Sequence, residues 1–144
     1  MAVTFDKTAG IACIPWDGLN KPYRLDNKVT IPVTAVSTDI IQCLPVKAGT
    51  VVLGVYEKIV TPATATSISA TVGDGATADG YDASIDLKGV AGTVTKSTPA
   101  DTYPAAGGKY YPADDTIDLV VTVNTMTVGA VIEVFADCLD LNRV

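Results

Sequence analysis

Apolar and polar residues alternate with a period of two along most of the chain from residue 29 onward. Apolar side chains at every second position are typical of a strand with one buried face. The pattern predicts strands within residues 29–35, 39–46, 50–60, 67–72, 81–87, 117–123 and 130–138, and a weak strand at 93–96. These are about seven or eight strands joined by short turns, which is typical of a sandwich or barrel.

Three segments modify this pattern. Pro32 has no amide hydrogen for a neighbouring strand, so we expect the strand at 29–35 to lie at a sheet edge or to contain a bulge. Strand 50–60 is apolar on both sides, which predicts burial of both its faces; one side carries Val51, Leu53, Val55 and Ile59, and the other carries Val52, Tyr56 and Val60. Residues 88–108 are rich in Gly, Thr, Ala and Pro and predict a long surface excursion.

The composition supports an all-β reading. Valine and threonine occur 19 times each and isoleucine 10 times, and these β-branched side chains fit a pleated sheet better than a helix. No segment of twelve or more residues has a helical period. A chain of 144 residues is one ordinary domain. We therefore predict a single antiparallel β-sandwich or barrel domain at residues 29–144 with an extended N-terminal arm at residues 1–28.

The predicted arm has no regular period, and turn signals interrupt it. It is nevertheless too apolar for a plain disordered tail. It should therefore dock on its own domain as a first strand or reach across to another subunit, and the sequence leaves both readings open. Its apolar candidates for such a contact are Phe5, Ile11, Ile14, Trp16 and Tyr23.

The charge pattern argues against several classes of partner. The net charge is −6 and the ten basic residues are scattered, so no basic face predicts nucleic-acid binding. No basic amphipathic helix, signal peptide or apolar run of membrane-spanning length is visible, so we expect no membrane association. Charged residues are only 18% of the chain, compared with roughly a quarter in average domains, which suggests that part of the surface faces other protein.

Candidate chemistry is sparse. The chain contains no histidine, which removes the Ser-His-Asp triad, the Cys-His dyad and most catalytic metal sites, and we expect no enzymatic activity and no cofactor. Its three cysteines are Cys13, Cys43 and Cys138, too few for a four-thiolate zinc site, and we expect them to be reduced and partly buried. Paired carboxylates can hydrolyse glycosides, and the candidate pairs are Asp114-Asp115 and Asp137 with Asp140. Asp114-Asp115 follows Pro-Ala and precedes a strand, which is typical of a turn.

The loop at residues 73–82 places Asp74, Asp79 and Asp82 among three glycines and two alanines. Its spacing does not match known calcium loops, so we interpret the glycines and aspartates as turn formers, and an ion there remains open. Gly107 and Gly108 precede a base and two aromatics, Lys109-Tyr110-Tyr111. Tyrosine is common at interfaces, so Tyr110 and Tyr111 are candidate contacts, and packing on a sheet rim is the alternative.

Three segments resemble a group of small virion proteins of tailed bacteriophages: TVGDGATADGYDASIDL (71–87), GGKYYPADDTIDLVVTV (107–123) and GAVIEVFADCLDL (129–141). The resemblance spans roughly residues 40–141. Some proteins of this group are capsid cement or decoration proteins, which are typically trimeric and β-rich and bind at three-fold positions of the shell.

The resemblance implies a structural protein on the capsid surface of a virion, assembled in the host cytoplasm. It implies a homotrimer that binds the major capsid protein and bridges its subunits; it implies no catalytic or ligand residues. A receptor- or glycan-binding head-fibre module is an alternative, with the loop tyrosines Tyr81, Tyr103, Tyr110 and Tyr111 as contacts. A tail or neck component is a second alternative.

Overall fold

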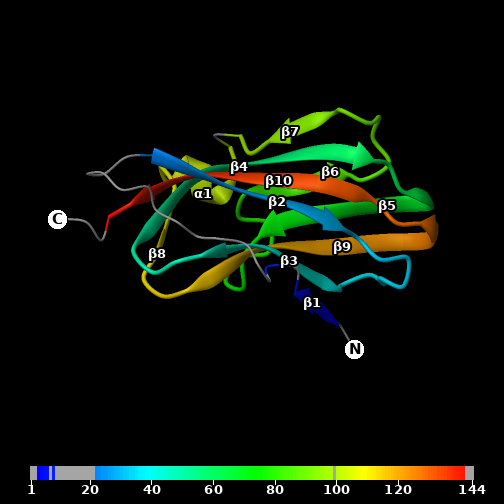
Figure 1. Cartoon of the computed structure of the whole chain (residues 1–144), viewed down its shortest axis with the longest axis horizontal. Coiled ribbons are helices and arrows are strands. Elements are labelled where there is room, and N and C mark those ends of the chain that lie inside the picture. The colour runs from blue at the N-terminus through cyan, green and yellow to red at the C-terminus, as the bar shows by residue number, and fades with distance from the viewer. Residues whose placement is uncertain (1–2, 7, 9–21, 99, 142–144) are drawn as a thin grey trace.

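The computed structural model describes residues 3–6, 8, 22–98 and 100–141. In this part of the chain two β-sheets pack face to face as a sandwich, with one short helix (Figure 1). The elements are β1 (Thr4–Asp6), β2 (Pro22–Thr30), β3 (Ile40–Val46), β4 (Thr50–Thr61), β5 (Thr64–Gly73), β6 (Asp82–Asp86), β7 (Val94–Lys96), α1 (Thr102–Ala105), β8 (Lys109–Tyr111), β9 (Asp115–Val128) and β10 (Val131–Asp140).

Sheet A has the strand order β1-β3-β9-β5-β6, and sheet B has the order β2-β10-β4-β7, with β8 also paired to β4. All neighbours are antiparallel except β1, which runs parallel to β3. The β9–β10 hairpin therefore supplies an inner strand to each sheet. The predicted sandwich is confirmed, and the described residues do not form a closed barrel. The short strands β1 and β8 raise the count above the predicted seven or eight.

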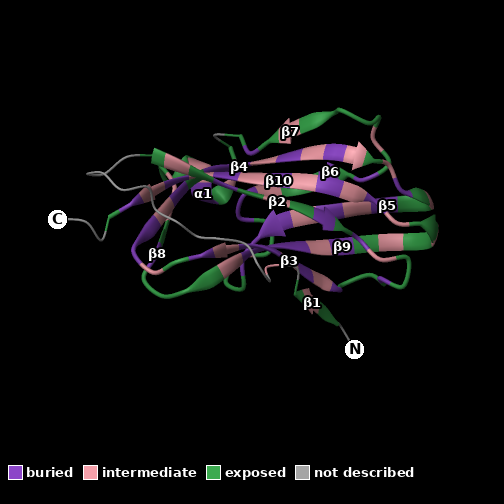
Figure 2. Cartoon of the chain, in the orientation of Figure 1, coloured by how far each residue is buried: buried purple, intermediate pink, exposed green. Residues whose placement is uncertain are grey.

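The inward faces of the two sheets form one core, because the period-two residues point to the same side of each strand. Figure 2 shows buried residues alternating with less buried ones along β10, where Ile132, Val134, Ala136 and Cys138 are completely buried. Facing them, sheet A contributes Ile117, Leu119 and Val121 from β9. Deletion of any of these large side chains would leave a cavity in a closely packed layer.

Bulges explain where the predicted faces change. In β4 the register with β10 skips from Gly54 to Val52, so Leu53 is an extra residue, and both Val52 and Val55 are buried. A similar shift in β3 between Gln42 and Leu44 buries both Cys43 and Leu44. Strict alternation from the sequence placed Val55 on the same side as Leu53, which is wrong because the bulge inverts the phase.

The first predicted strand was placed too late in the sequence. β2 runs from Pro22 to Thr30, and Ile31 to Asp39 form turns, so Pro32 lies in a loop and not in a strand. The boundary predicted between residues 28 and 29 consequently falls inside β2, which pairs along its length with β10. β9 also continues beyond the predicted end of the strand at 117–123, to Val128 opposite Thr64.

The predicted excursion at residues 88–108 covers an edge of sheet B. β7 pairs with β4 at Tyr56–Lys58 and β8 pairs with it at Thr50–Val52, while Ser97 bonds the backbone of Val55 between them. The exposed edge of β4 is thus capped along much of its length, which protects it from pairing with another chain. Within the described ranges, no helix is long and apolar enough to span a membrane.

Candidate protein interface

The outer face of sheet B carries apolar and aromatic side chains that no described layer covers. β4 contributes Val51, Leu53, Tyr56 and Val60, and β10 contributes Val131, Phe135 and Leu139; all are half-buried or exposed. The sequence predicted burial of both faces of strand 50–60, but only the inner face is buried within the described chain. The outer face of this strand is as apolar as a buried face although it is not buried, which indicates a surface for protein contact.

Aromatic and aliphatic residues lie next to one another on this outer face. Phe135 is directly opposite Tyr56, and Val51 is directly opposite both Leu139 and Tyr110. The Arg24 guanidinium lies 5.5 Å from the Tyr56 ring centre and 6.0 Å from that of Phe135. Tyrosine, phenylalanine and arginine are enriched in protein interfaces, so the composition of this patch favours protein contact.

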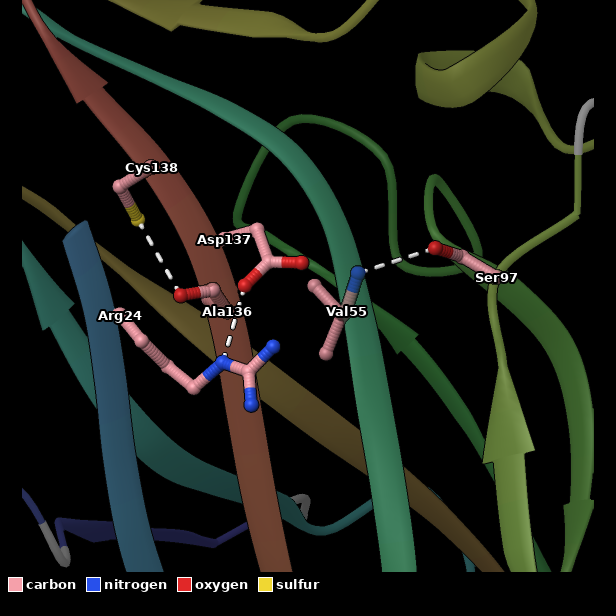
Figure 3. A network of polar contacts seen from close by, with 6 residues as sticks. All are labelled: Arg24, Val55, Ser97, Ala136, Asp137 and Cys138. Carbon is pink, nitrogen blue, oxygen red and sulfur yellow. Dashed lines mark hydrogen bonds and ion pairs between the residues drawn. The ribbon is translucent and has the colours of Figure 1, made fainter. Parts of the chain in front are cut away.

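Salt bridges fix the charged side chains among these aromatics. Arg24 on β2 bonds Asp137 on β10 at 2.9 Å, and Lys58 on β4 bonds Glu133 on β10 at 3.2 Å. Figure 3 shows the Arg24–Asp137 pair, with the Cys138 thiol donating to the Ala136 carbonyl nearby. Both pairs are partly exposed and contribute little to stability, about 0–1 kcal/mol each. Their larger effect is to place both signs of charge on one face.

The outer face of sheet A has a different chemistry. Ser69 lies opposite Thr122 and Asp86, and Ser67 lies opposite Asn124. These hydroxyl residues line a shallow groove of about 300 Å³ that also touches Lys88, whose ammonium donates to the Thr66 carbonyl. Serine is depleted in protein interfaces. The contrast between the two faces indicates that sheet B is the better candidate for protein contact.

The predicted contact residues lie in different settings. Tyr110 is 51% exposed on β8 beside the sheet B patch, whereas Tyr111 is only 2% exposed and belongs to the core. Phe5 on β1 and Tyr23 on β2 are partly buried against the core, and the Tyr23 hydroxyl lies 3.0 Å from that of Thr50. Ile11, Ile14 and Trp16 lie outside the described residues. The structure therefore brings one predicted residue, Tyr110, to the candidate patch.

A buried carboxylate gathers the tyrosines that were considered as sugar contacts. Tyr103 donates to Asp74 Oδ1 at 2.7 Å and Tyr111 donates to Oδ2 at 3.0 Å. The hydroxyl oxygens of Tyr81 and Tyr111 lie 2.9 Å apart. Three of the four predicted glycan contacts, Tyr81, Tyr103 and Tyr111, are thus buried. Their prediction as exposed loop contacts was wrong, because their hydroxyls form hydrogen bonds inside the protein.

The same carboxylate explains the loop at residues 73–82. Asp74 Oδ1 also accepts from the backbone amides of Ala76 and Thr77, so Asp74 forms the turn that the sequence suggested. Burial alone would raise the Asp74 pKa, but the hydrogen bonds from Tyr103, Thr77, Tyr111 and Ala76 hold that pKa below its ordinary value. Among the described residues, no group of three or more His, Cys, Asp or Glu side chains is arranged to hold a metal ion.

Two further acids are buried without full hydrogen bonding. Glu57 is 1% exposed on the inner face of β4, and neither of its carboxyl oxygens has a hydrogen-bond partner among the residues that the structure describes. Burial raises the pKa of Glu57 to about 8. Asp118 lies opposite Gly73, where the backbone of Thr77 and Ala78 closes over the sheet, and burial raises its pKa to about 6. Both are therefore more easily held as neutral acids in the folded state.

Two cysteines match their prediction. Cys43 and Cys138 are free and completely buried, and burial raises the pKa of the Cys43 thiol. Cys13 lies outside the described residues. A buried, protonated thiol acts as a small apolar residue, so these two positions contribute packing.

Three solved structures share this fold. Against a chain of the capsid asymmetric unit of cyanophage Pam1 the TM-score is 0.64 with 19% identity, covering 92% of this chain and 94% of the other. Against the capsid of Ralstonia phage GP4 the TM-score is 0.66 with 15% identity, covering 97% and 98%. The fold is found in phage capsids. A chain from the acidic stable capsid of Helicobacter pylori bacteriophage KHP30 gives 0.57 with 15% identity, covering 84% and 89%.

No protein-family model and no curated protein sequence matches the chain. At identities below 20% these structural matches show a shared fold, and they cover between 84% and 97% of this chain. The three capsid chains therefore share most of the chain's fold with this protein, and not one motif.

Sequence reasoning missed most of the candidate patch. Tyr56 and Phe135 fell within predicted strands and Arg24 within the predicted arm, and none of the three was a candidate contact. The available signal was the apolar second side of strand 50–60, since a strand in a one-domain sandwich has no second core to bury that side. The pairing of β2 with β10, which brings Arg24 to the aromatics, could not be read from the sequence.

Proposed function

We propose that this protein is a capsid cement or decoration protein, which binds the outer surface of a phage head and stabilises it by bridging capsid subunits. The observation that carries the proposal is the fold shared over 84–97% of the chain with chains from three phage capsids. The segments that resemble tailed-phage virion proteins agree with it, and the partner would be the major capsid protein.

The rigid sandwich suits a bridging role physically. A decorating protein gains strength from several simultaneous contacts, none of which must be tight alone. Such contacts need a scaffold that holds its surfaces in fixed positions. Here each sheet is built around an inner strand, β9 or β10, that pairs on both sides. The two sheets share one core, so a force applied to one face is transmitted to the other through packed side chains.

We assign the outer face of sheet B to contact between copies in a homotrimer. This face bears four basic side chains, Arg24, Lys28, Lys58 and Lys96, and three acidic ones, Asp26, Glu133 and Asp137. A surface with nearly equal numbers of both signs can contact the neighbouring copies through opposite charges where three copies meet about a three-fold axis. Tyr56 and Phe135 at its centre supply the apolar area that such an interface needs.

The decisive experiment is decoration of empty shells assembled from the capsid protein encoded with this chain. Purified protein should co-sediment with the shells, saturate at a fixed ratio to the capsid subunit, and raise the temperature at which the shells break. Cryo-electron microscopy should then show density on the outer surface at three-fold positions. Absence of co-sedimentation, or density confined to the tail or neck of virions, would reject the proposal.

A further inference from the structure

One end of the sandwich is formed by four loops that are nearly free of charge. Backbone bonds join neighbouring pairs of these loops: Ile31 N–H donates to the Ala130 carbonyl, and Ala63 N–H donates to that of Leu87. They lie together at the right-hand end of Figure 1. We call this surface the valine end; it comprises residues 31–38, 61–64, 87–94 and 124–131.

The valine end has an unusual composition for loops. Its four segments contain one charged residue, Lys88, whose ammonium is bonded back to Thr66 on sheet A, whereas charged residues make up 18% of the chain. The carboxylate that follows the first loop, Asp39, is buried and accepts from the backbone amides of Val3 and Val36. Loops are normally the most polar part of a surface, so this depletion of charge marks a contact surface.

Exposed valines occupy this charge-free surface. Val33, Val36, Val90 and Val128 each have between 47% and 77% of their surface exposed. Val33, Val36 and Val90 lie in loops and Val128 ends β9, and the sandwich holds these segments in place. Gly129 next to Val128 packs against the Ile31 carbonyl, and the Gly92 N–H donates to the Ile59 carbonyl. Exposing four apolar side chains to water is unfavourable, and burying them against a partner would contribute favourable free energy to binding.

The opposite end of the sandwich is acidic. Its loops at residues 47–49, 74–81, 100–108 and 112–115 contain five aspartates and one lysine. That lysine, Lys47, is already paired with Asp114 at 2.8 Å. The exposed carboxylates of Asp79 and Asp115 are hydrated, and burying them against a partner would cost free energy unless each found a cation.

From these two ends we infer that the protein stands end-on, with the valine end seated on an uncharged, apolar patch of a shell subunit. This inference rests on the proposed function. End-on seating removes the valines from water while every exposed aspartate of the acidic end stays hydrated. A second copy at the valine end would instead form a closed two-fold pair that consumes this surface and leaves two acidic ends facing outward, with nothing to grip the shell.

The experiment compares two matched charge insertions in the shell-decoration assay. Val33→Asp with Val128→Asp places two carboxylates on the valine end, and Ala106→Asp with Ala113→Asp places two on exposed alanines of the acidic end. The first variant should bind shells at least about tenfold more weakly, because each carboxylate must be desolvated against an uncharged patch. The second should bind as the wild-type protein does.

Several outcomes overturn the inference. The end-on inference is overturned if the valine-end variant binds shells as the wild-type protein does, or if both variants lose binding equally. In either case the proposed function is still supported as long as the wild-type protein decorates the shells. Failure of the wild-type protein to bind shells rejects the proposed function itself. Circular dichroism and thermal unfolding establish that each variant is folded. Val90→Asp, on a separate loop, repeats the test if the double variant is unstable, and it should weaken binding in the same direction.

Discussion

The Tyr103 hydroxyl donates to Asp74 Oδ1 at 2.7 Å and so ties α1 to the loop between β5 and β6. The tie is reinforced where Tyr111 on β8 donates to the other oxygen of the same carboxylate. The Tyr103 and Tyr81 rings meet edge to face with their centres 4.9 Å apart. One buried acid thereby organises three segments that cover an end of the sandwich.

Asp74→Asn should lower the free energy of unfolding by about 3 kcal/mol, because hydrogen bonds to a buried charged group are worth roughly 1.5–3 kcal/mol each. Urea denaturation followed by circular dichroism measures this loss. Asp79→Asn, exposed in the same loop, is the matched control and should change stability by less than about 0.5 kcal/mol. Since the Asp74 pKa is lowered, its stabilisation is complete above the ordinary value of 3.8 and is lost as pH falls below it.

Gly80→Ala should destabilise the protein by about 1–3 kcal/mol, because an added methyl group would overlap the Tyr103 ring. Displacement of that ring would also disturb the Tyr103–Asp74 hydrogen bond. Gly75→Ala in the same loop meets nothing within 4 Å and serves as control. Thermal unfolding of both variants checks the pair. Equal melting temperatures for the two would show that the ring moves aside freely.

Glu57→Gln should flatten the dependence of stability on pH. The unfolded chain releases this proton near 4.5, whereas the folded chain holds it to about 8, because burial raises the pKa and the neighbouring carboxylates Asp82 and Asp101 add to it. The folded state therefore binds more protons in this window, and the free energy of unfolding falls as pH rises from about 4.5 to 8. Subtracting the variant's profile from that of the wild type isolates this contribution; parallel profiles would contradict the assignment.

Phe135→Asp should convert the proposed trimer to single chains, because it places a charge at the centre of the sheet B patch, opposite Tyr56. Thr122→Asp makes the corresponding change on the exposed outer face of sheet A and should leave the mass unchanged. Light scattering at several concentrations measures the mass of each protein. A Phe135→Asp variant that keeps the wild-type mass would move the contact between copies away from this face.

Deletion of residues 1–20 should weaken trimerisation or shell binding while the sandwich stays folded. The deletion removes β1, which pairs with only three residues at the edge of β3 and leaves both inner strands untouched. Circular dichroism should therefore keep its β signal, and light scattering and shell co-sedimentation report the functional loss. An unchanged trimer that still decorates shells would show that the arm is dispensable.

The fold class was predictable because alternation is a local property. In β10 the alternation of residues from Ile132 to Cys138 predicts the buried face from the local sequence alone. Boundaries were harder, since Pro22–Thr30 has charged residues at alternate positions and becomes a strand only by pairing with β10. The local pattern determines the buried face of β10, whereas pairing with a distant strand determines that β2 forms.

The candidate surfaces were only partly predictable for the same reason. The exposed position of Tyr110 and the core position of Tyr111 follow from strand alternation, but which of the two faces inward depends on the pairing of β8 with β4. The valine end joins loops that are up to about a hundred residues apart in sequence, and their shared lack of charge becomes visible only after the chain has folded.

The position of the β9–β10 hairpin also governs when this protein can form. Its strands are the last of those described to leave the ribosome, yet one lies between β3 and β5 and the other between β2 and β4. Every earlier strand that flanks them must wait, with its backbone unpaired on that side, until residues 115–140 have been synthesised. Such long-range pairing is typical of slow folding, and translation that stops before the hairpin should yield an aggregating fragment rather than a smaller stable sheet.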